Sequence, residues 1–218
     1  MTSANSTVGV FIIAIMVLIG YFVVEKFTTD LVYVSSPFDG RSYLVRNLSD
    51  KEDAATLLAK LRSKLTKLVK KLVSHYPHDK RVMRLQSRFN PNDMSEVPAD
   101  SKYTSYSVNK GEQIVYCLRS RDSEERLVDL NTILFVALHE LSHVMTISVG
   151  HTPEFWDNFR FLLANAIHWN MYTAVNFRKT PKAYCGTHIT DSPLDDVDMK
   201  KYVSYDDAID ERNEADVS

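Results

Sequence analysis

Residues 129–150 read DLNTILFVALHELSHVMTISVG, and this stretch decides the fold. Asp129 is a typical N-cap residue, the segment after it is strongly apolar, and Gly150 is typical of a chain leaving a helix. We therefore predict a helix from Leu130 to about Ile147. A helix that is apolar on nearly every side belongs at the centre of a domain, with the other elements packed around it.

The last turns of this predicted helix contain His139-Glu140-Leu141-Ser142-His143, an H-E-x-x-H sequence. Residues four apart lie on one face of a helix, one turn apart, so the two imidazoles can converge on one zinc ion. Glu140 points to the side on which a metal-bound water would sit. The pattern predicts a zinc site, and the alternative is two ordinary histidines on a mostly buried helix.

A third histidine lies in the segment after the helix. His151 follows Gly150, whose conformational freedom lets the chain reverse, and precedes Thr152-Pro153, which predict the N-cap and first residue of another helix. The reversal could bring His151 over the first two histidines. Three protein ligands that leave the fourth position for water are typical of catalytic zinc. Glu154 and Asp157 are the alternatives to His151 as third ligand.

Two segments before the helix predict a β-hairpin. Tyr103–Val108 and Gln113–Leu118 alternate polar with apolar or aromatic residues around the turn sequence Asn109-Lys110-Gly111.

Cys117 and Cys185 are the only cysteines in the chain, which excludes a cysteine-rich zinc module. Zinc would already have three histidines and a water, so neither thiol is needed as a ligand. We expect both to be unpaired thiols, because the N-terminal part of the chain, considered below, predicts that the folded domain lies on the reducing, cytoplasmic side of a membrane.

The first part of the folded region predicts a small hairpin, or two strand fragments, and then a long basic helix. Leu31–Val34 and Ser42–Val45 are β-prone runs, and Ser49 with Glu52 has the spacing of a capping box before apolar residues recur at helical spacing to about His75. Ten basic residues against one acid, Asp79, lie on this helix and the next segment: Lys60, Arg62, Lys64, Lys67, Lys70, Lys71, Lys80, Arg81, Arg84 and Arg88. We interpret them as a solvated helix face, ahead of anionic lipid, with nucleic acid an unlikely partner.

The N-terminal segment is free of charge. Met1–Val24 contains no charged side chain, and the 17 residues Val8–Val24 are almost wholly apolar, a run that as a helix just spans a bilayer core. No basic residue precedes the run and no cleavage site is visible, so a retained single-pass anchor is favoured over a signal peptide. Lys26, Arg41 and Arg46 follow the run, which predicts that the folded domain lies on the cytoplasmic side.

The whole chain has 218 residues, of which 44% are hydrophobic and 25% charged, with a net charge of −2. These values are typical of a globular protein and exclude a wholly disordered chain, a collagen and a polytopic membrane protein. We predict a transmembrane anchor over residues 1–26, one folded domain over 27–190, and an acidic tail over 191–218. The tail has ten acidic residues against three basic ones, so we expect it to be solvated and poorly ordered.

The residues around the histidines resemble a known family. His139-Glu140-x-x-His143 followed by GHTPEFW at 150–156 is similar to the minimal zincin metallopeptidases of the WLM, SprT and YgjP-like group. The loop that leads to His151 is longer than is usual in WLM and YgjP-like proteins. Over YLVRNL at 43–48, SKYTSYSVNKGE at 101–112 and YCG at 184–186, the chain also resembles WLM-like proteins encoded by large double-stranded DNA viruses.

The resemblance implies an α+β, zincin-like metallopeptidase domain, in which a small antiparallel sheet packs on the active-site helix, with an N-terminal single transmembrane helix. His139, His143 and His151 would hold Zn²⁺, and Glu140 would activate the zinc-bound water that hydrolyses a peptide bond. In zincins the substrate commonly adds as an extra strand to a sheet edge beside the active-site helix, and Gln113–Leu118 is the candidate for that edge. The implied function is a membrane-anchored zinc metallopeptidase with a protein or peptide substrate.

Two competing functions share these features. One is a structural or scaffold membrane protein of a virion, a minor capsid or inner-membrane protein that retains a zincin fold, although an intact Glu140 favours the enzyme. The other is a peptidase acting on DNA-bound proteins. The viral resemblance implies a virion inner membrane or a host internal membrane, with capsid proteins as possible partners. For the oxyanion donor, Tyr184 and His188 are candidates, against a packed tyrosine and a surface histidine.

Overall fold

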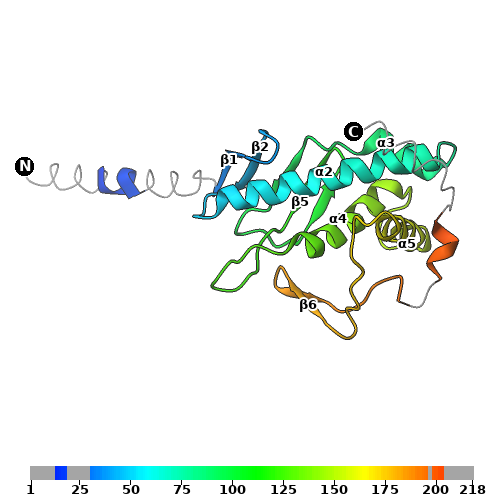
Figure 1. The fold of residues 1–218 in the computed structure, drawn as a ribbon. Coiled ribbons are helices and arrows are strands. Elements are labelled where there is room, and N and C mark those ends of the chain that lie inside the picture. The colour runs from blue at the N-terminus through cyan, green and yellow to red at the C-terminus, as the bar shows by residue number, and fades with distance from the viewer. Residues whose placement is uncertain (1–12, 19–29, 196–197, 204–218) are drawn as a thin grey trace, which may run out of the picture.

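The computed structural model describes residues 13–18, 30–195 and 198–203. In this part of the chain, a five-stranded sheet lies against a layer of helices, and a separate two-stranded hairpin lies at the bottom of the view (Figure 1). The four α-helices of the domain are α2 (Lys51–His75), α3 (Lys80–Arg88), α4 (Leu130–Met145) and α5 (Pro153–His168). The predicted α+β class is therefore confirmed.

The five-stranded sheet has the strand order β1-β2-β3-β5-β4. Its strands are β1 (Leu31–Ser35), β2 (Ser42–Arg46), β3 (Met94–Glu96), β4 (Tyr106–Val108) and β5 (Gln113–Tyr116). The two predicted hairpins, β1–β2 and β4–β5, are confirmed as antiparallel pairs.

The sheet as a whole is mixed, whereas the sequence predicted an antiparallel one. The pairs β2–β3 and β3–β5 are parallel. The first pair is parallel because α2 and α3 carry the chain back across the sheet between β2 and β3. Strand β5 lies between β3 and β4, so the prediction that Gln113–Leu118 forms the edge is wrong. The edge strand beside α4 is β4.

Helix α2 buries the apolar face that its periodicity predicted, but it begins differently. Its N-cap residue is Asp50, whose side chain makes no capping hydrogen bond, so the capping box predicted from Ser49 and Glu52 is not formed. The Asp50 carboxylate instead accepts a hydrogen bond of 2.6 Å from Arg119, which is buried and also donates to Glu96 at 2.8 Å. A buried guanidinium must be paired, and this need outweighs the local capping motif.

The caps predicted for α4 and α5 are both present. Asp129 accepts a hydrogen bond of 2.9 Å from the backbone N–H of Thr132, and Thr152 caps α5 with Pro153 in its first turn. The two helices pack together through aromatic side chains, and the rings of Phe135 and Phe159 lie 5.3 Å apart. The H-E-x-x-H sequence therefore lies on a rigid, buried helix.

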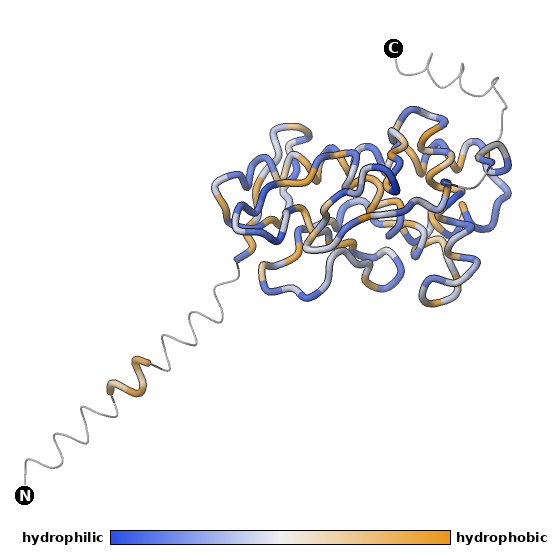
Figure 2. The backbone as a smooth tube through the Cα atoms, turned by 90° about the horizontal axis from the view of Figure 1, so that it is seen from below, coloured by the Kyte–Doolittle hydropathy of each residue, from blue (hydrophilic) through white to orange (hydrophobic). Residues whose placement is uncertain are grey.

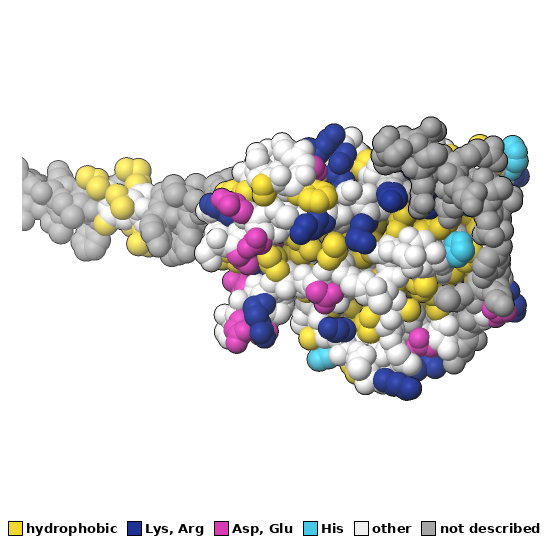
Figure 3. Space-filling model, in the orientation of Figure 1, with side chains coloured by type: hydrophobic (Ala, Val, Ile, Leu, Met, Phe, Trp, Pro, Cys, Tyr) yellow, Lys and Arg dark blue, Asp and Glu magenta, His cyan; other side chains and the backbone are white. Residues whose placement is uncertain are grey.

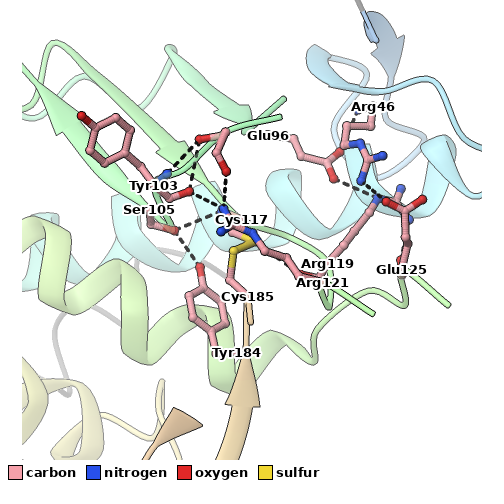
Figure 4. The surroundings of a disulfide bond; sticks show 11 residues. Arg46, Glu96, Tyr103, Ser105, Cys117, Arg119, Arg121, Glu125, Tyr184 and Cys185 are labelled. Carbon is pink, nitrogen blue, oxygen red and sulfur yellow. Dashed lines mark hydrogen bonds and ion pairs between the residues drawn. A yellow bond between two sulfur atoms is a disulfide. The ribbon is translucent and has the colours of Figure 1, made fainter. Parts of the chain in front are cut away.

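Cys117 and Cys185 form a disulfide with Cα atoms 6.0 Å apart, so the prediction of two unpaired thiols is wrong. Cys185 lies in the turn of the small hairpin formed by β6 (Lys182–Tyr184) and β7 (Thr187–Ile189). This hairpin meets the chain just after β5 (Figure 4). The two cysteines are 68 residues apart in sequence, and no local pattern predicts such a contact.

The described part of the predicted acidic tail, residues 191–195 and 198–203, packs on α5 and is not freely solvated. The Tyr202 hydroxyl donates to Asp157 at 3.1 Å, and the Tyr202 carbonyl accepts a hydrogen bond of 2.9 Å from Asn165. Leu194 and Tyr202 also pack against the core. These two residues supply apolar contacts that the acidic composition of the segment concealed.

The predicted transmembrane run Val8–Val24 lies largely outside the described residues. Its described part, Ile13–Leu18, is an exposed, apolar helical segment (Figure 2). In the portion of the chain that the structure describes, no helix combines the length and the apolar character needed to cross a membrane.

On the face seen in Figure 3, Lys and Arg side chains are scattered over the surface and do not gather in one patch. Several basic residues of α2 also have partners within the fold. Arg62 donates to the Pro91 carbonyl at 3.0 Å, and Lys64 donates to the Met171 carbonyl at 2.7 Å. The basic face of α2 therefore has structural roles of its own.

Candidate metal centre and active site

Three histidines converge beside the C-terminal half of α4. His139 and His143 come from α4, and His151 comes from the loop before α5. One ring nitrogen of each lies within 4.8 Å of the others, and Nε2 of His151 is 3.1 Å from Nε2 of His139. Three imidazole nitrogens this close are a donor set that suits zinc. The structure thus brings together the residues that the sequence analysis selected.

Burial keeps two of these imidazoles neutral. It lowers the pKa of His139 to about 3, with a further contribution from the neighbouring histidines. Burial and the nearby His151 likewise lower the pKa of His143 to about 4. A neutral imidazole has a free lone pair, so these two rings are ready to bind a metal at neutral pH.

The alternative ligands, Glu154 and Asp157, are engaged elsewhere. Glu154 accepts hydrogen bonds from the backbone N–H groups of Ile147 at 3.0 Å and Ser148 at 3.2 Å, and from the Ser148 hydroxyl at 3.0 Å. It therefore fixes the loop that leads to His151. Asp157 pairs with Arg81 at 3.0 Å.

Three cations bind the end of α4 and the start of the same loop. Arg84 donates to the Met145 carbonyl at 2.6 Å and Arg88 to the Val144 carbonyl at 3.3 Å. Lys110, from the β4–β5 turn, donates to the carbonyls of residues 146, 147 and 148 at 3.2, 3.2 and 2.9 Å. Cations at a helix C-terminus satisfy its last carbonyls and complement its dipole. The sequence showed these residues only as basic, and nothing in it indicated this role.

Glu140 lies at the wall of a cavity of about 680 Å³ that also reaches the three histidines. Its side chain is buried, and burial raises its pKa to about 7. The edge strand β4 and the two residues before it also line the cavity, through residues 104–107. A carboxylate with a pKa near neutrality can both accept and return a proton at physiological pH.

The two candidate oxyanion donors differ in position. Tyr184, at the end of β6, is buried and lines the cavity. His188, on β7, is exposed and is not among the residues that line it. Ser105, which the sequence analysis did not select, lines the cavity next to Tyr184 and binds its hydroxyl at 2.6 Å. A serine in a loop before a strand carries no signal by which it could have been found.

Fold and site together define an α+β protein of the H-E-x-x-H class, with a three-histidine centre that can hold a metal ion. The model of the WLM domain matches residues 39–215, and the chain belongs to the WLM family. The resemblance noted in the sequence is therefore confirmed.

The relatives of this chain include viral proteins. An uncharacterised protein of Acanthamoeba polyphaga mimivirus is 34% identical over 190 residues, which are 84% of this chain and 94% of that protein. An uncharacterised protein of Invertebrate iridescent virus 6 is 33% identical over 97 residues, 44% of this chain and 53% of that protein. These relatives support the prediction of a viral protein. Among solved structures, Wss1 from Saccharomyces cerevisiae is 23% identical, with a TM-score of 0.44, over 58% of this chain and 86% of that one.

Proposed function

We propose that the protein is a zinc-dependent metallopeptidase that hydrolyses peptide bonds in protein or peptide substrates. The observation that carries the proposal is the placement of three convergent imidazoles next to a buried carboxylate, on a cavity bordered by a sheet edge. Membership of the WLM family supports the same function. The scaffold alternative gives no reason for Glu140, because burying a carboxylate has a free-energy cost that a purely structural site does not need.

Each residue of the site has a role in this reaction. Zinc on His139, His143 and His151 would supply Lewis acidity, which polarises the substrate carbonyl and acidifies a water. Glu140 accepts the proton of the attacking water and then passes it to the leaving amine. Glu154 and Lys110 bind the loop that leads to His151, and they thereby hold His151 close to the two histidines of α4.

The substrate would bind as an extended strand along β4. This strand pairs with β5 on one side only, so its other edge has backbone groups available for a peptide. The cavity joins that edge to Glu140 and the histidines, so a peptide on β4 would pass over the reacting groups. The substrate-binding edge that we predicted at Gln113–Leu118 is thus assigned to the neighbouring strand, β4.

The apolar run 8–24 supports attachment to a membrane as part of this proposal. A single-pass protein of a virion inner membrane or a host internal membrane, and capsid proteins as partners, stay predictions.

Metal analysis and peptide cleavage by the full chain in detergent test the proposal. We expect about one zinc per chain in the wild type and in Glu140→Gln, and a clear loss of zinc in His151→Ala. Only the wild type should cleave a broad peptide library. Absence of bound metal from the wild type would remove the site, and equal cleavage by Glu140→Gln would remove the assigned role of Glu140.

A further inference from the structure

Two hydroxyl groups meet at the wall of the cavity. Tyr184 is the last residue of β6, and Ser105 precedes β4. Their oxygens lie 2.6 Å apart, and both residues line the cavity that contains His139 and Glu140. Figure 4 shows the Tyr184 ring reaching from the hairpin toward Ser105, directly beside the Cys117–Cys185 disulfide.

The Ser105–Tyr184 pair has one hydroxyl hydrogen left to donate in a hydrogen bond. The backbone N–H of Cys117 donates to the Ser105 hydroxyl oxygen at 3.1 Å, so this oxygen already serves as an acceptor. The two hydroxyls together have two hydrogens, and the hydrogen bond between them uses one, whichever of the two donates. One hydrogen is left, and it belongs to a group on the cavity wall. Neither oxygen has a further protein acceptor within hydrogen-bonding distance among the described residues.

The covalent structure fixes the position of Tyr184. Cys185 and Gly186 both have positive φ angles, of 49° and 76°, and form the two-residue turn of the β6–β7 hairpin. The disulfide ties Cys185 to the residue that follows β5. Tyr184 is therefore held between a tight turn and a cross-link, with 4% of its surface exposed. Burial, together with the nearby Glu140, raises the pKa of Tyr184, so its hydroxyl keeps its proton at neutral pH.

We propose that the Ser105–Tyr184 hydroxyl pair donates the hydrogen bond that stabilises the oxyanion during peptide hydrolysis, and that the Cys117–Cys185 disulfide positions Tyr184 for this purpose. The inference rests on the proposed peptidase function. As the water oxygen bonds to the carbonyl carbon, the π electrons of the carbonyl move onto its oxygen, and the water proton goes to Glu140. The hydroxyl pair donates a hydrogen bond to the charged oxygen and retains its own proton.

The first experiment compares Tyr184→Phe, Ser105→Ala and the double variant in the full chain. Each single variant keeps one hydroxyl hydrogen, so we expect each to lose less activity than the double variant. The double variant should lose about a hundredfold in kcat, the effect typical of removing an oxyanion donor, with little change in KM and with zinc retained. Tyr172→Phe is the matched control, because Tyr172 is a buried tyrosine that packs on Phe135 and does not line the cavity.

A second readout does not depend on turnover. A phosphinic peptide imitates the tetrahedral, charged oxygens of the transition state, and an uncleaved peptide of the same sequence does not. The double variant should bind the phosphinic peptide about a hundredfold more weakly than the wild type, in proportion to the loss of kcat. Its affinity for the unmodified peptide should not change. Equal weakening for both peptides would mean a merely structural role and would overturn the proposal.

The disulfide is tested by combining Cys117→Ser and Cys185→Ser with Tyr184→Phe. If the disulfide acts through Tyr184, its removal should weaken phosphinic-peptide binding in the wild-type background and have little further effect in the Tyr184→Phe background. Equal losses in both backgrounds would show that the disulfide supports the fold alone.

The outcomes separate this inference from the function on which it rests. A wild type that cleaves peptides, with a double variant that cleaves them equally fast, leaves the peptidase and removes the oxyanion role. A wild type that neither cleaves peptides nor binds the phosphinic peptide removes both.

Discussion

Asp50 is the partly exposed carboxylate that pairs with the buried Arg119. The hydrogen bond from Arg119 lowers the pKa of Asp50 below its usual value of 3.8. Because the folded-state pKa is the lower one, the unfolded chain binds more protons in acid. The stabilisation from this pair is therefore complete above about pH 4 and is lost as the pH falls through the folded-state pKa.

We expect Asp50→Asn to lower the free energy of unfolding at pH 7, and we expect its difference from the wild type to shrink below about pH 4. Urea unfolding followed by circular dichroism from pH 7 to pH 3 measures this. Asp53→Asn is the control, since Asp53 is an exposed carboxylate in the same first helical turn. A constant difference across the pH range would contradict the assignment of the pair.

At the residue scale, the sequence predicted the side chains whose relative positions are set by one helix. His139, Glu140 and His143 have their relative positions fixed by helical spacing alone. Arg119 and Ser105 could not be predicted, because their partners lie far along the chain: Arg119 binds Asp50 and Glu96, and Ser105 binds Tyr184. A buried cation and a loop serine have no periodic pattern that would distinguish them from surface residues.

The β4–β5 turn is the element that joins the edge strand β4 to the end of α4, near the three histidines. A Cβ atom at Gly111 would lie 2.8 Å from a side-chain carbon of Val144 and 2.9 Å from the carbonyl oxygen of Arg88. Gly111 also has a φ of +110°, where L-residues are strained. The turn can therefore approach the end of α4 only with glycine at this position.

We expect Gly111→Ala to destabilise the fold by about 2–4 kcal/mol, from backbone strain and from overlap with α4. Gly40→Ala is the matched control, because Gly40 also has a positive φ, of +70°, but a Cβ there would have no atom within 4 Å apart from those of its chain neighbours. Gly40→Ala should lower the free energy of unfolding by only about 1 kcal/mol. Thermal unfolding of both variants gives the comparison, and equal losses would show that the close approach is not important.

The loop before α5 is the second element on which the site depends. Glu154 supports it through three hydrogen bonds to Ile147 and Ser148. We expect Glu154→Ala to weaken zinc binding about 10- to 100-fold, as is usual when the support of a metal ligand is removed, while α5 stays folded. Competition with a zinc chelator measures the affinity. Asp157→Ala should change it little, since Asp157 binds Arg81 and Tyr202 and has no hydrogen bond to the loop.

At the element scale, local signals predicted the helices and hairpins, and long-range pairing limited the rest. The N-caps Asp129 and Thr152 are local signals, and they give the starts of α4 and α5. The strand order depends on β3, a strand of three residues that inserts between β2 and β5. So short a strand has too little periodicity to be recognised, and the sequence pattern therefore did not show that β5 pairs on both sides.

At the scale of the whole molecule, the disulfide and the N-terminal charges point to opposite compartments. The basic residues after Val24 predict a cytoplasmic domain, whereas disulfides persist mainly in oxidising compartments. A cross-link between residues 68 apart contributes about 4 kcal/mol by the chain-entropy estimate. Three positive charges give only a statistical bias in orientation. We therefore expect the folded domain to lie on the oxidising side of the membrane.

Asn47 provides a direct reporter of this orientation. It begins the sequence Asn47-Leu48-Ser49, an acceptor site for N-glycosylation, and its side chain is exposed. When the full chain is expressed in eukaryotic cells, we expect a glycan at Asn47 that is lost in Asn47→Gln, and no free thiols under non-reducing, unfolding conditions. The domain should also be protected from protease in sealed membranes. An unmodified Asn47, two free thiols and a protease-sensitive domain would instead restore the cytoplasmic orientation and would show that Cys117 and Cys185 are reduced in the cell.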